Sequence, residues 1–246
     1  MQATSALDRA MAMVRDLRQR CPWDRVQTRE TLRPYLLEEV HELDQAIADG
    51  NPAAIRGEVS DLLLHLAWQL VLAEETGDFT ADQVAGDLET KMKRRHPHLF
   101  DLGPKEPWEA IKKREGAQSV LAGLPPRLPD LLMAYRLGER AAAVGFDWPD
   151  HSGPIAKVTE ELAEVEAALG DRAHLEDEIG DLLLAAVNVA RKVGIPPGPA
   201  LDRANRRFAE RFAGVERLAE ARGVDIATAG LETLDRLWNE VKADTT

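Results

Sequence analysis

Residues 57–71 read Gly-Glu-Val-Ser-Asp-Leu-Leu-Leu-His-Leu-Ala-Trp-Gln-Leu-Val. Wound as a helix at 100° per residue, the apolar side chains of this run spread around nearly the whole circumference, and only Glu58, Asp61 and His65 share a narrow polar stripe. A helix that is apolar on nearly all sides is typical of the interior of a helical bundle. The stretch therefore predicts a buried helix whose two carboxylates lie inside the bundle.

The same pattern occurs a second time further along the chain. Residues 177–184 read Asp-Glu-Ile-Gly-Asp-Leu-Leu-Leu and correspond to residues 57–64. An acidic run precedes each copy, Leu-Glu-Glu-Val-His-Glu at 37–42 and Thr-Glu-Glu-Leu-Ala-Glu at 159–164. Downstream, the matching features are Lys91 and Arg95 with Arg207 and Arg211, and Trp108 and Lys112 with Trp238 and Lys242. Four features in one order indicate an internal duplication.

Helix-favouring residues dominate the rest of the chain, and breakers fall in short clusters. This predicts an all-α fold made of tandem helical-bundle modules. The pair Thr80 and Gln83 predicts a capping box for a helix that runs to about Arg95. We expect an N-terminal module at 1–100, a proline-rich linker with a short helix at 101–128, and a C-terminal module at 129–246. Helix breaks are expected at Cys21-Pro22, 50–52, Gly77-Asp78, Pro97, 145–153 and 196–199.

The overall composition excludes several classes of protein. The 246 residues carry a formal charge of −12, which argues against a nucleic-acid surface. No apolar run approaches the roughly 18 residues that span a bilayer, and the N-terminus lacks an apolar signal core, so we expect a cytoplasmic protein. The single cysteine, Cys21, excludes an internal disulfide and a cysteine-cluster metal site.

The repeated carboxylates predict a metal site. On each helix pair the acids stand on the shoulder of an apolar stripe, and neither helix shows an obvious basic partner on that stripe. Buried carboxylates need compensation, and oxygen-only ligands favour Mg²⁺, with Mn²⁺ as a substitute. The predicted metal ligands are Glu39, Glu42, Glu58 and Asp61 in the first copy, and Glu161, Glu164, Glu178 and Asp181 in the second.

Two other interpretations of these acids stay open at this point. Glu-Glu-x-x-Glu is also typical of a solvated helix face. A di-iron bundle would need Glu-x-x-His on two helices; Glu38-x-x-His41 satisfies this once, but Ala163 occupies the matching position in the second copy. His65, matched by Ala185, is interpreted as helix filler.

Basic and aromatic residues follow each acidic pair. Arg207 and Arg211 are four residues apart, so they share a helix face. A solvated basic patch would explain them, but beside a metal site they suit a polyphosphate. Trp238 is followed four residues later by Lys242, which suits a base-stacking platform, although an isolated tryptophan is more often core.

Taken together, these residues resemble the MazG family of nucleoside triphosphate pyrophosphohydrolases, in its two-domain form. Cys21-Pro22-Trp23-Asp24, residues 94–98 (Arg-Arg-His-Pro-His) and residues 144–148 (Val-Gly-Phe-Asp-Trp) also look like segments of this family. The resemblance implies Mg²⁺-dependent hydrolysis of NTPs and dNTPs between the α and β phosphates, which yields a nucleoside monophosphate and pyrophosphate. It also implies a homodimer whose sites draw on both subunits, and a role in nucleotide-pool housekeeping.

The resemblance also implies roles for individual residues. Glu161, Glu164, Glu178 and Asp181 would hold the metal, and Glu160 would support them or accept a proton. His174, Arg207 and Arg211 would meet the phosphates, and Trp238 and Lys242 would complete the nucleotide pocket. The C-terminal copy would be the main catalytic one, while the N-terminal copy keeps all four of its carboxylates. This chain departs from the family pattern at two positions: His174 stands where a basic residue often precedes the second Glu-x-x-Asp, and Arg207 stands where Lys is common.

Three alternatives remain at this stage. The first is a module that senses nucleotides without cleaving them, and the second is a structural bundle that dimerises through apolar faces. The third is a pyrophosphohydrolase specific for one nucleotide, such as dUTP.

Overall fold

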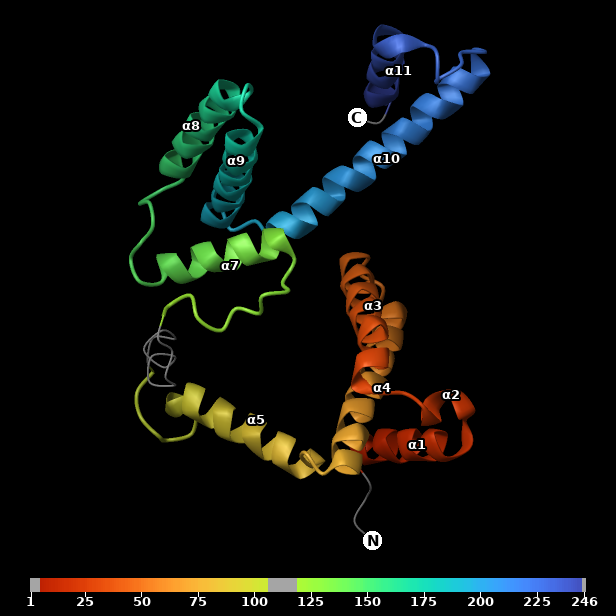
Figure 1. Ribbon diagram of the computed structural model, residues 1–246, viewed down its shortest axis with the longest axis vertical. Helices are drawn as coiled ribbons and strands as arrows, with labels where there is room; N and C mark the ends of the chain where they lie inside the picture. The colour runs from red at the N-terminus through yellow and green to blue at the C-terminus, as the bar shows by residue number, and fades with distance from the viewer. Residues whose placement is uncertain (1–4, 106–118, 245–246) are drawn as a thin grey trace. The chain divides into compact units, whose positions relative to one another are not determined.

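A computed structural model describes residues 5–105 and 119–244 of the chain. These residues form helices and contain no strand, which confirms the predicted all-α class (Figure 1). The chain divides into two compact units, Met1–Lys105 and Glu106–Thr246. Trp108, Lys112 and most of the expected linker helix lie outside the described residues.

The N-terminal unit is built on a hairpin of two long helices. Its elements are α1 (Ala6–Arg20), α2 (Pro22–Arg25), α3 (Arg29–Ala48), α4 (Pro52–Thr76), α5 (Ala81–Arg95) and the 3₁₀ turn η1 (Pro97–Leu99). Helix α3 packs along α4, and α1 packs against α4 as well. The core consists of Met11, Val14, Leu32, Ala67, Trp68, Leu70, Val71 and Leu72. Most of these core residues come from the second half of α4, so the first half, with Glu58 and Asp61, is left less covered.

Local signals place the ends of these helices. Helix α4 begins where the Asn51 side chain accepts the backbone N–H groups of Ala53 and Ala54, and it ends at Gly77, whose φ of 73° is left-handed. The predicted capping box of Thr80 and Gln83 is present, and α5 ends at Arg95 as expected.

The C-terminal unit repeats the hairpin. Its elements are α7 (Asp130–Ala142), α8 (Ser152–Ala168), α9 (Arg172–Lys192), α10 (Pro197–Ala221) and α11 (Gly230–Asp244). Helix α8 packs along α9, and α7 packs against α9. Helix α10 leaves the α7 and α9 end of the hairpin and packs with α11 around Val215, Ala219 and Leu237 (Figure 1). Thus α3–α4 and α8–α9 are the two copies of one hairpin.

The predicted helix breaks also occur in the structure. All six expected positions lie at the end of a helix or between two helices. Across the two described stretches, we find no helix with the length and apolar character needed to cross a membrane.

Candidate metal centre

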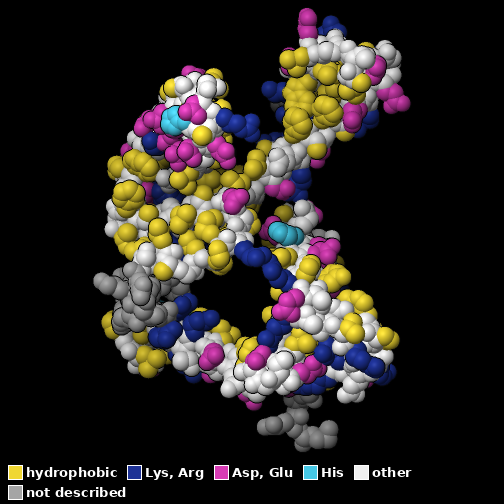
Figure 2. Space-filling model, viewed as in Figure 1, with side chains coloured by type: hydrophobic (Ala, Val, Ile, Leu, Met, Phe, Trp, Pro, Cys, Tyr) yellow, Lys and Arg dark blue, Asp and Glu magenta, His cyan; other side chains and the backbone are white. Residues whose placement is uncertain are grey.

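Three glutamates of the C-terminal hairpin converge on one point. Glu161 and Glu164 lie on α8, and Glu178 lies opposite them on α9. Each offers a carboxylate oxygen, and these oxygens lie within 4.8 Å of one another. Acidic side chains gather over this hairpin, beside exposed apolar ones (Figure 2). The second predicted group thus comes together at three of its four metal positions.

Glu161 is the most enclosed of these acids, with 3% of its surface exposed. Its Oε2 atom is buried and has no hydrogen-bond partner, whereas Oε1 lies 2.6 Å from Nζ of Lys157. The same ammonium lies 2.8 Å from Oε1 of Glu160. The expectation that no basic residue accompanies the acids was therefore wrong for this copy, and the i,i+4 spacing of Lys157 and Glu161 is the signal that could have found it.

The electrostatics of the C-terminal cluster follow from these contacts. The hydrogen bond from Lys157 lowers the pKa of Glu161 in spite of burial, and its two glutamate partners raise the pKa of Lys157. A hydrogen bond with Glu161, burial and the charges of Glu161 and Glu178 raise the pKa of Glu164. The ring of His174 places Nε2 3.3 Å from Oε1 of Glu178. Within the part of the chain that the structure describes, the basic contacts of the cluster are thus the ammonium of Lys157 at Glu161 and the ring of His174 at Glu178.

The N-terminal hairpin forms a matching cluster. Glu39 and Glu42 on α3 and Glu58 on α4 also bring carboxylate oxygens within 4.8 Å of one another. Burial, and then the charges of Asp61, Glu42 and other glutamates, raise the pKa of Glu39. Burial and the neighbouring Glu42 and Asp61 likewise raise the pKa of Glu58. Burial and repulsion among the acids therefore both disfavour the charged forms of Glu39 and Glu58.

His65 lies one helical turn beyond Asp61 and is buried, as expected for a residue that fills space in the helix. Its Nδ1 atom is enclosed and has no hydrogen-bond partner. Burial lowers the pKa of this imidazole, and Asp61 acts in the opposite direction. Burial thus favours the neutral form of His65 at the edge of the acidic stripe.

The burial expected for the carboxylates is only partly observed. Glu161 is buried, and Glu39, Glu58 and Glu178 are half-buried. The remaining predicted positions, Glu42, Asp61, Glu160, Glu164 and Asp181, are exposed. A helix that is apolar on all sides was expected to be covered on all sides, but the helices packed against α4 leave part of its surface open. Leu66 on α4, for example, keeps 57% of its surface exposed.

The donor chemistry fits a hard divalent cation. Every convergent ligand atom is a carboxylate oxygen, which favours Mg²⁺ or Mn²⁺ over softer metals. A buried carboxylate oxygen without a partner is costly, and a cation would satisfy the free Oε2 of Glu161. The residues present therefore suit such an ion.

Comparisons with known proteins agree with this chemistry. The MazG nucleotide pyrophosphohydrolase domain matches residues 27–100. The nucleoside triphosphate pyrophosphohydrolase of Escherichia coli (strain K12) is 40% identical over 247 residues, covering 94% of this chain and 94% of that protein. The nucleoside triphosphate pyrophosphohydrolase/pyrophosphatase MazG of Thermotoga maritima is 41% identical over 228 residues, covering 90% and 89%. This chain belongs to the MazG family.

The alignment with a more distant relative covers a smaller share of both chains. The nucleoside triphosphate pyrophosphohydrolase of Mycobacterium tuberculosis is 35% identical over 196 residues, which is 74% of this chain and 59% of that protein. Membership in the MazG family thus rests on relatives that span nearly all of the chain.

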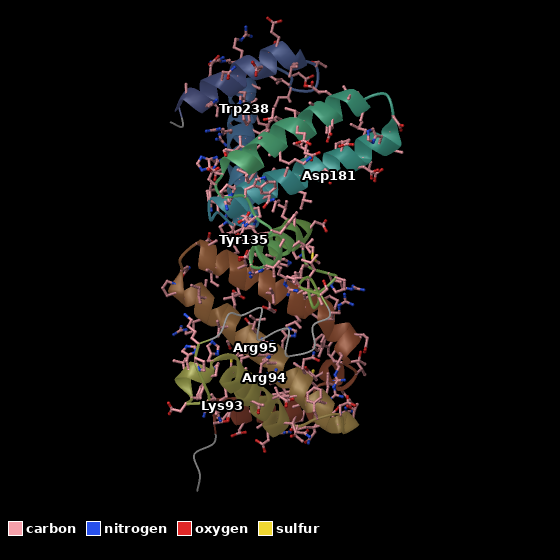
Figure 3. All side chains as sticks on the ribbon, turned by 90° about the vertical axis from the view of Figure 1, so that its left-hand side faces the viewer. Lys93, Arg94, Arg95, Tyr135, Asp181 and Trp238 are labelled. Atoms are coloured by element: carbon pink, nitrogen blue, oxygen red, sulfur yellow. The ribbon has the colours of Figure 1, made fainter. Side chains whose placement is uncertain are left out.

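Of the predicted nucleotide-binding residues of this MazG chain, His174 lies on α9 beside Glu178, and the others lie on α10 and α11. Arg207 is exposed and Arg211 half-buried on α10, while Trp238 packs into the α10–α11 core. The ring of Trp238 lies 5.1 Å from that of Phe208, which is largely exposed. Figure 3 shows Asp181 on α9 and Trp238 on α11. Among the described residues, we find no ion pair or hydrogen bond from Arg207, Arg211 or Trp238 to the carboxylate cluster.

A set of contacts that was not predicted from the sequence, here called the latch, connects Asp147 and Trp148 of the loop before α8 to the end of α9 and the start of α8. Asp147 lies 2.6 Å from Nη2 of Arg191 and 2.9 Å from Nζ of Lys192, both at the end of α9. These cations hold the pKa of Asp147 far below its usual range. The neighbouring Trp148 packs directly on Gly153, in the first turn of α8. The latch therefore joins the start of α8 to the end of α9 and supports the hairpin that carries Glu161.

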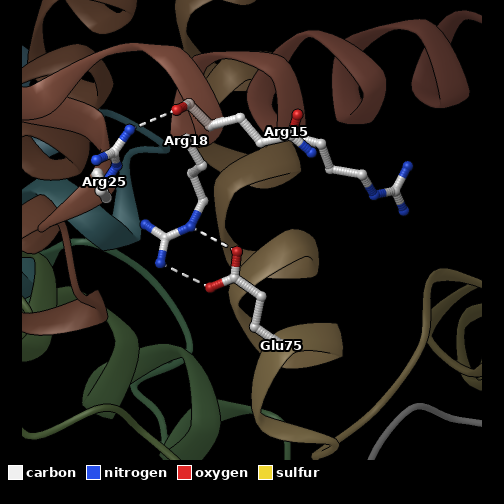
Figure 4. Close-up of a pocket in the computed structure, with 5 residues that line it drawn as sticks. Arg15, Arg18, Arg25 and Glu75 are labelled. Carbon is white, nitrogen blue, oxygen red and sulfur yellow. Dashed lines mark hydrogen bonds and ion pairs between the residues drawn. The ribbon is translucent and has the colours of Figure 1, made fainter.

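An arginine-lined cavity of about 310 Å³ lies in the N-terminal unit, bordered by Arg15, Arg18, Gln19, Arg25 and Glu75. Glu75 follows Asp61 by 14 residues on α4, or about 21 Å along the helix, so this cavity is separate from the N-terminal carboxylates. Arg18 is already engaged by Glu75, and Arg15 points away from it toward its own partner, Glu74 (Figure 4). We therefore interpret the residues around the cavity as structural contacts that hold α1 against α4.

Proposed function

We propose that this chain hydrolyses nucleoside triphosphates, NTPs and dNTPs, to nucleoside monophosphate and pyrophosphate at the C-terminal carboxylate cluster, with Mg²⁺ as cofactor. The observation that carries the proposal is the buried, unpartnered Oε2 of Glu161 within a group of three converging carboxylates. Membership in the MazG family supports the class of reaction. The nucleotide pool of the cytoplasm would supply the substrates, and we expect the enzyme to act there.

The C-terminal hairpin would supply the metal ligands. Glu161, Glu164 and Glu178 would bind the cation, and Asp181, one turn further along α9, would complete the set. When bound, Mg²⁺ neutralises the triphosphate and polarises its P–O bonds. Glu160 neighbours Glu161 on α8 and is exposed, so it could accept the proton of the attacking water.

Other residues would bind the nucleotide itself. Arg207 and Arg211 would bind the phosphates, and His174 would assist them when it is protonated. Trp238 and the exposed Phe208 offer an aromatic surface for the base, with Lys242 alongside.

A homodimer forms part of the proposal. Large apolar side chains stay exposed on both hairpins, among them Val40, Leu66, Leu162 and Leu183. A second copy would cover these faces, and it could bring its basic and aromatic helices to the cluster. Sedimentation at micromolar concentration should then give twice the 27.2 kDa chain mass. A monomer with full activity would contradict this part of the proposal.

The N-terminal cluster would bind a cation through Glu39, Glu42 and Glu58, with Asp61 at its edge. The variant Glu58→Gln can decide whether the N-terminal copy also hydrolyses nucleotides. We expect that variant to keep most pyrophosphate release, since the C-terminal copy would be the main catalytic one.

The test is a product assay on each NTP and dNTP with Mg²⁺. We expect monophosphate and pyrophosphate, whereas diphosphate with orthophosphate would place the cleavage elsewhere. Glu178→Gln and Asp181→Asn should each lower turnover at least about a hundredfold with the helical signal unchanged, because each removes a ligand from the charged centre. Glu176→Gln, an exposed acid on the same helix, is the matched control and should stay active. Equal activity of all three variants would refute the site.

A further inference from the structure

The two carboxylate clusters differ in the cations placed beside them. In the C-terminal copy, Nζ of Lys157 lies 2.6 Å from Glu161 and 2.8 Å from Glu160. In the duplication, the position of Lys157 corresponds to Tyr35. Tyr35 packs edge-on against Trp23, with ring centroids 6.1 Å apart. One substitution between the copies thus exchanges a cation for a neutral ring.

The second cationic position differs in the same way. His174 lies beside Glu178, and its counterpart in the N-terminal copy is Ala54. Among the described residues, no Lys or Arg forms an ion pair with Glu39, Glu42 or Glu58, in contrast to the pair of Lys157 with Glu161. Of the two C-terminal pairs, Lys157 with Glu161 is the more shielded from water, because its side chains are 38% and 4% exposed against 60% and 13% for His174 with Glu178.

The ammonium of Lys157 has two consequences for Glu161. It engages Oε1, so it orients the carboxylate and leaves the enclosed Oε2 as the free ligand atom. It also puts a positive charge within a few ångströms of any ion bound at Oε2. Even at the dielectric constant of bulk water, a single and a double charge at that separation repel enough to change a binding constant about tenfold.

We propose that Lys157 is a resident counter-ion that keeps the nucleotide-free C-terminal cluster weak for divalent cations, so that the cation enters together with the triphosphate. The phosphates bring negative charge that offsets the repulsion from Lys157, which couples the two binding events. Lys157 is a positioning residue in this scheme. The inference rests on the proposed function, because it takes a triphosphate as the ligand.

The test measures Mg²⁺ binding by calorimetry, with and without a non-hydrolysable triphosphate analogue. All proteins carry Glu58→Gln to weaken the N-terminal cluster. Without nucleotide, Lys157→Met should bind Mg²⁺ about tenfold more tightly or better. The gain in Mg²⁺ affinity caused by the analogue should shrink by the same factor.

Two variants control for charge and for surface effects. Lys157→Arg keeps the charge and should behave as the parent protein. Lys93→Met removes an exposed lysine that pairs with Glu89 on α5, and it should leave Mg²⁺ affinity unchanged. If Lys157→Met binds Mg²⁺ equally or more weakly, or if Lys157→Arg shifts as far as the methionine variant, the counter-ion role is overturned.

Failure of the function and failure of this inference are distinguishable. If the parent protein releases pyrophosphate but Lys157→Met does not change the Mg²⁺ affinity, the counter-ion role of Lys157 is refuted and the proposed enzymatic function stands. If Lys157→Met binds Mg²⁺ more tightly but the parent protein releases no pyrophosphate from any nucleotide, the counter-ion role is supported and the proposed pyrophosphohydrolase activity is refuted.

Discussion

Arg18 joins three elements of the N-terminal unit, and its removal should cost far more stability than removal of its neighbour Arg15. The guanidinium forms a two-pronged contact with Glu75 on α4, at 2.5 and 2.6 Å. It also donates to the backbone oxygens of Asp24 and Gln27, at 3.0 and 3.2 Å. Its Cζ atom lies 5.4 Å from the ring centre of Trp68. The side chain is 17% exposed, so these contacts are largely shielded from water.

The expected loss in the free energy of unfolding follows from these contacts. Glu75 is 43% exposed, so the ion pair contributes only about 0.5 kcal/mol. Each backbone oxygen that loses a charged donor in a partly buried setting costs roughly 1 kcal/mol or more. The contact with Trp68 adds about 0.5–1 kcal/mol. We therefore expect Arg18→Ala to lower the free energy of unfolding by about 3 kcal/mol, against about 0.5 kcal/mol for Arg15→Ala, whose pair with Glu74 is exposed.

Urea unfolding followed by circular dichroism measures this difference. Glu75→Gln separates the share of the ion pair from that of the backbone contacts, and it should cost well under 1 kcal/mol, roughly the surface-pair value. An equal loss in the free energy of unfolding for Arg18→Ala and Arg15→Ala would refute the claim that Arg18 holds α1, α4 and the segment at Asp24–Gln27 together.

Three further predictions concern the hairpins. Asp147→Asn should lower the melting temperature at neutral pH, because it removes the ion pairs with Arg191 and Lys192. These ion pairs lower the pKa of Asp147 in the folded chain below its ordinary 3.8. The difference in melting temperature between the variant and the parent protein should therefore narrow as the pH falls below about 4. Gly153→Ala would place a methyl group 2.0 Å from Cδ1 of Trp148 and should cost about 1–3 kcal/mol in urea unfolding, whereas Gly180→Ala, with open space around it, should be neutral or stabilising. Glu39→Gln should raise the melting temperature measured with a chelator, because it relieves carboxylate repulsion, and should reduce the stabilisation by Mg²⁺; a chelated variant that melts no higher than the parent would contradict this.

Local and periodic features of the fold were predictable from the sequence. The helix ends follow from single residues, such as Asn51 at the start of α4, and the capping box at Thr80 needs only two side chains. The pairing of the hairpins followed from the duplication, because an apolar helix must lie against the helix beside it. These features depend on residues a few positions apart, where the geometry of the helix leaves few alternatives.

Burial was less predictable, because it depends on what covers each face. Asp61 shares a stripe with Glu58, yet one is exposed and the other half-buried. The periodicity of α4 states that its faces are apolar but not whether a second layer covers them. The same limit applies to the latch at Asp147, whose partners stand 44 and 45 positions later and leave no local pattern.

The divergence of the two copies can be located on one helix face. Positions i, i+3, i+4 and i+7 lie together on a helix, so the residues at 157, 160, 161 and 164 form one surface, as do those at 35, 38, 39 and 42. Three of the four positions carry glutamate in both copies, and only the first differs, Lys157 against Tyr35. Both hairpins nevertheless gather three carboxylates within the same 4.8 Å. A charge can thus change at one position while the ligand geometry is kept, and for this reason metal affinity could diverge between the copies without a change in fold.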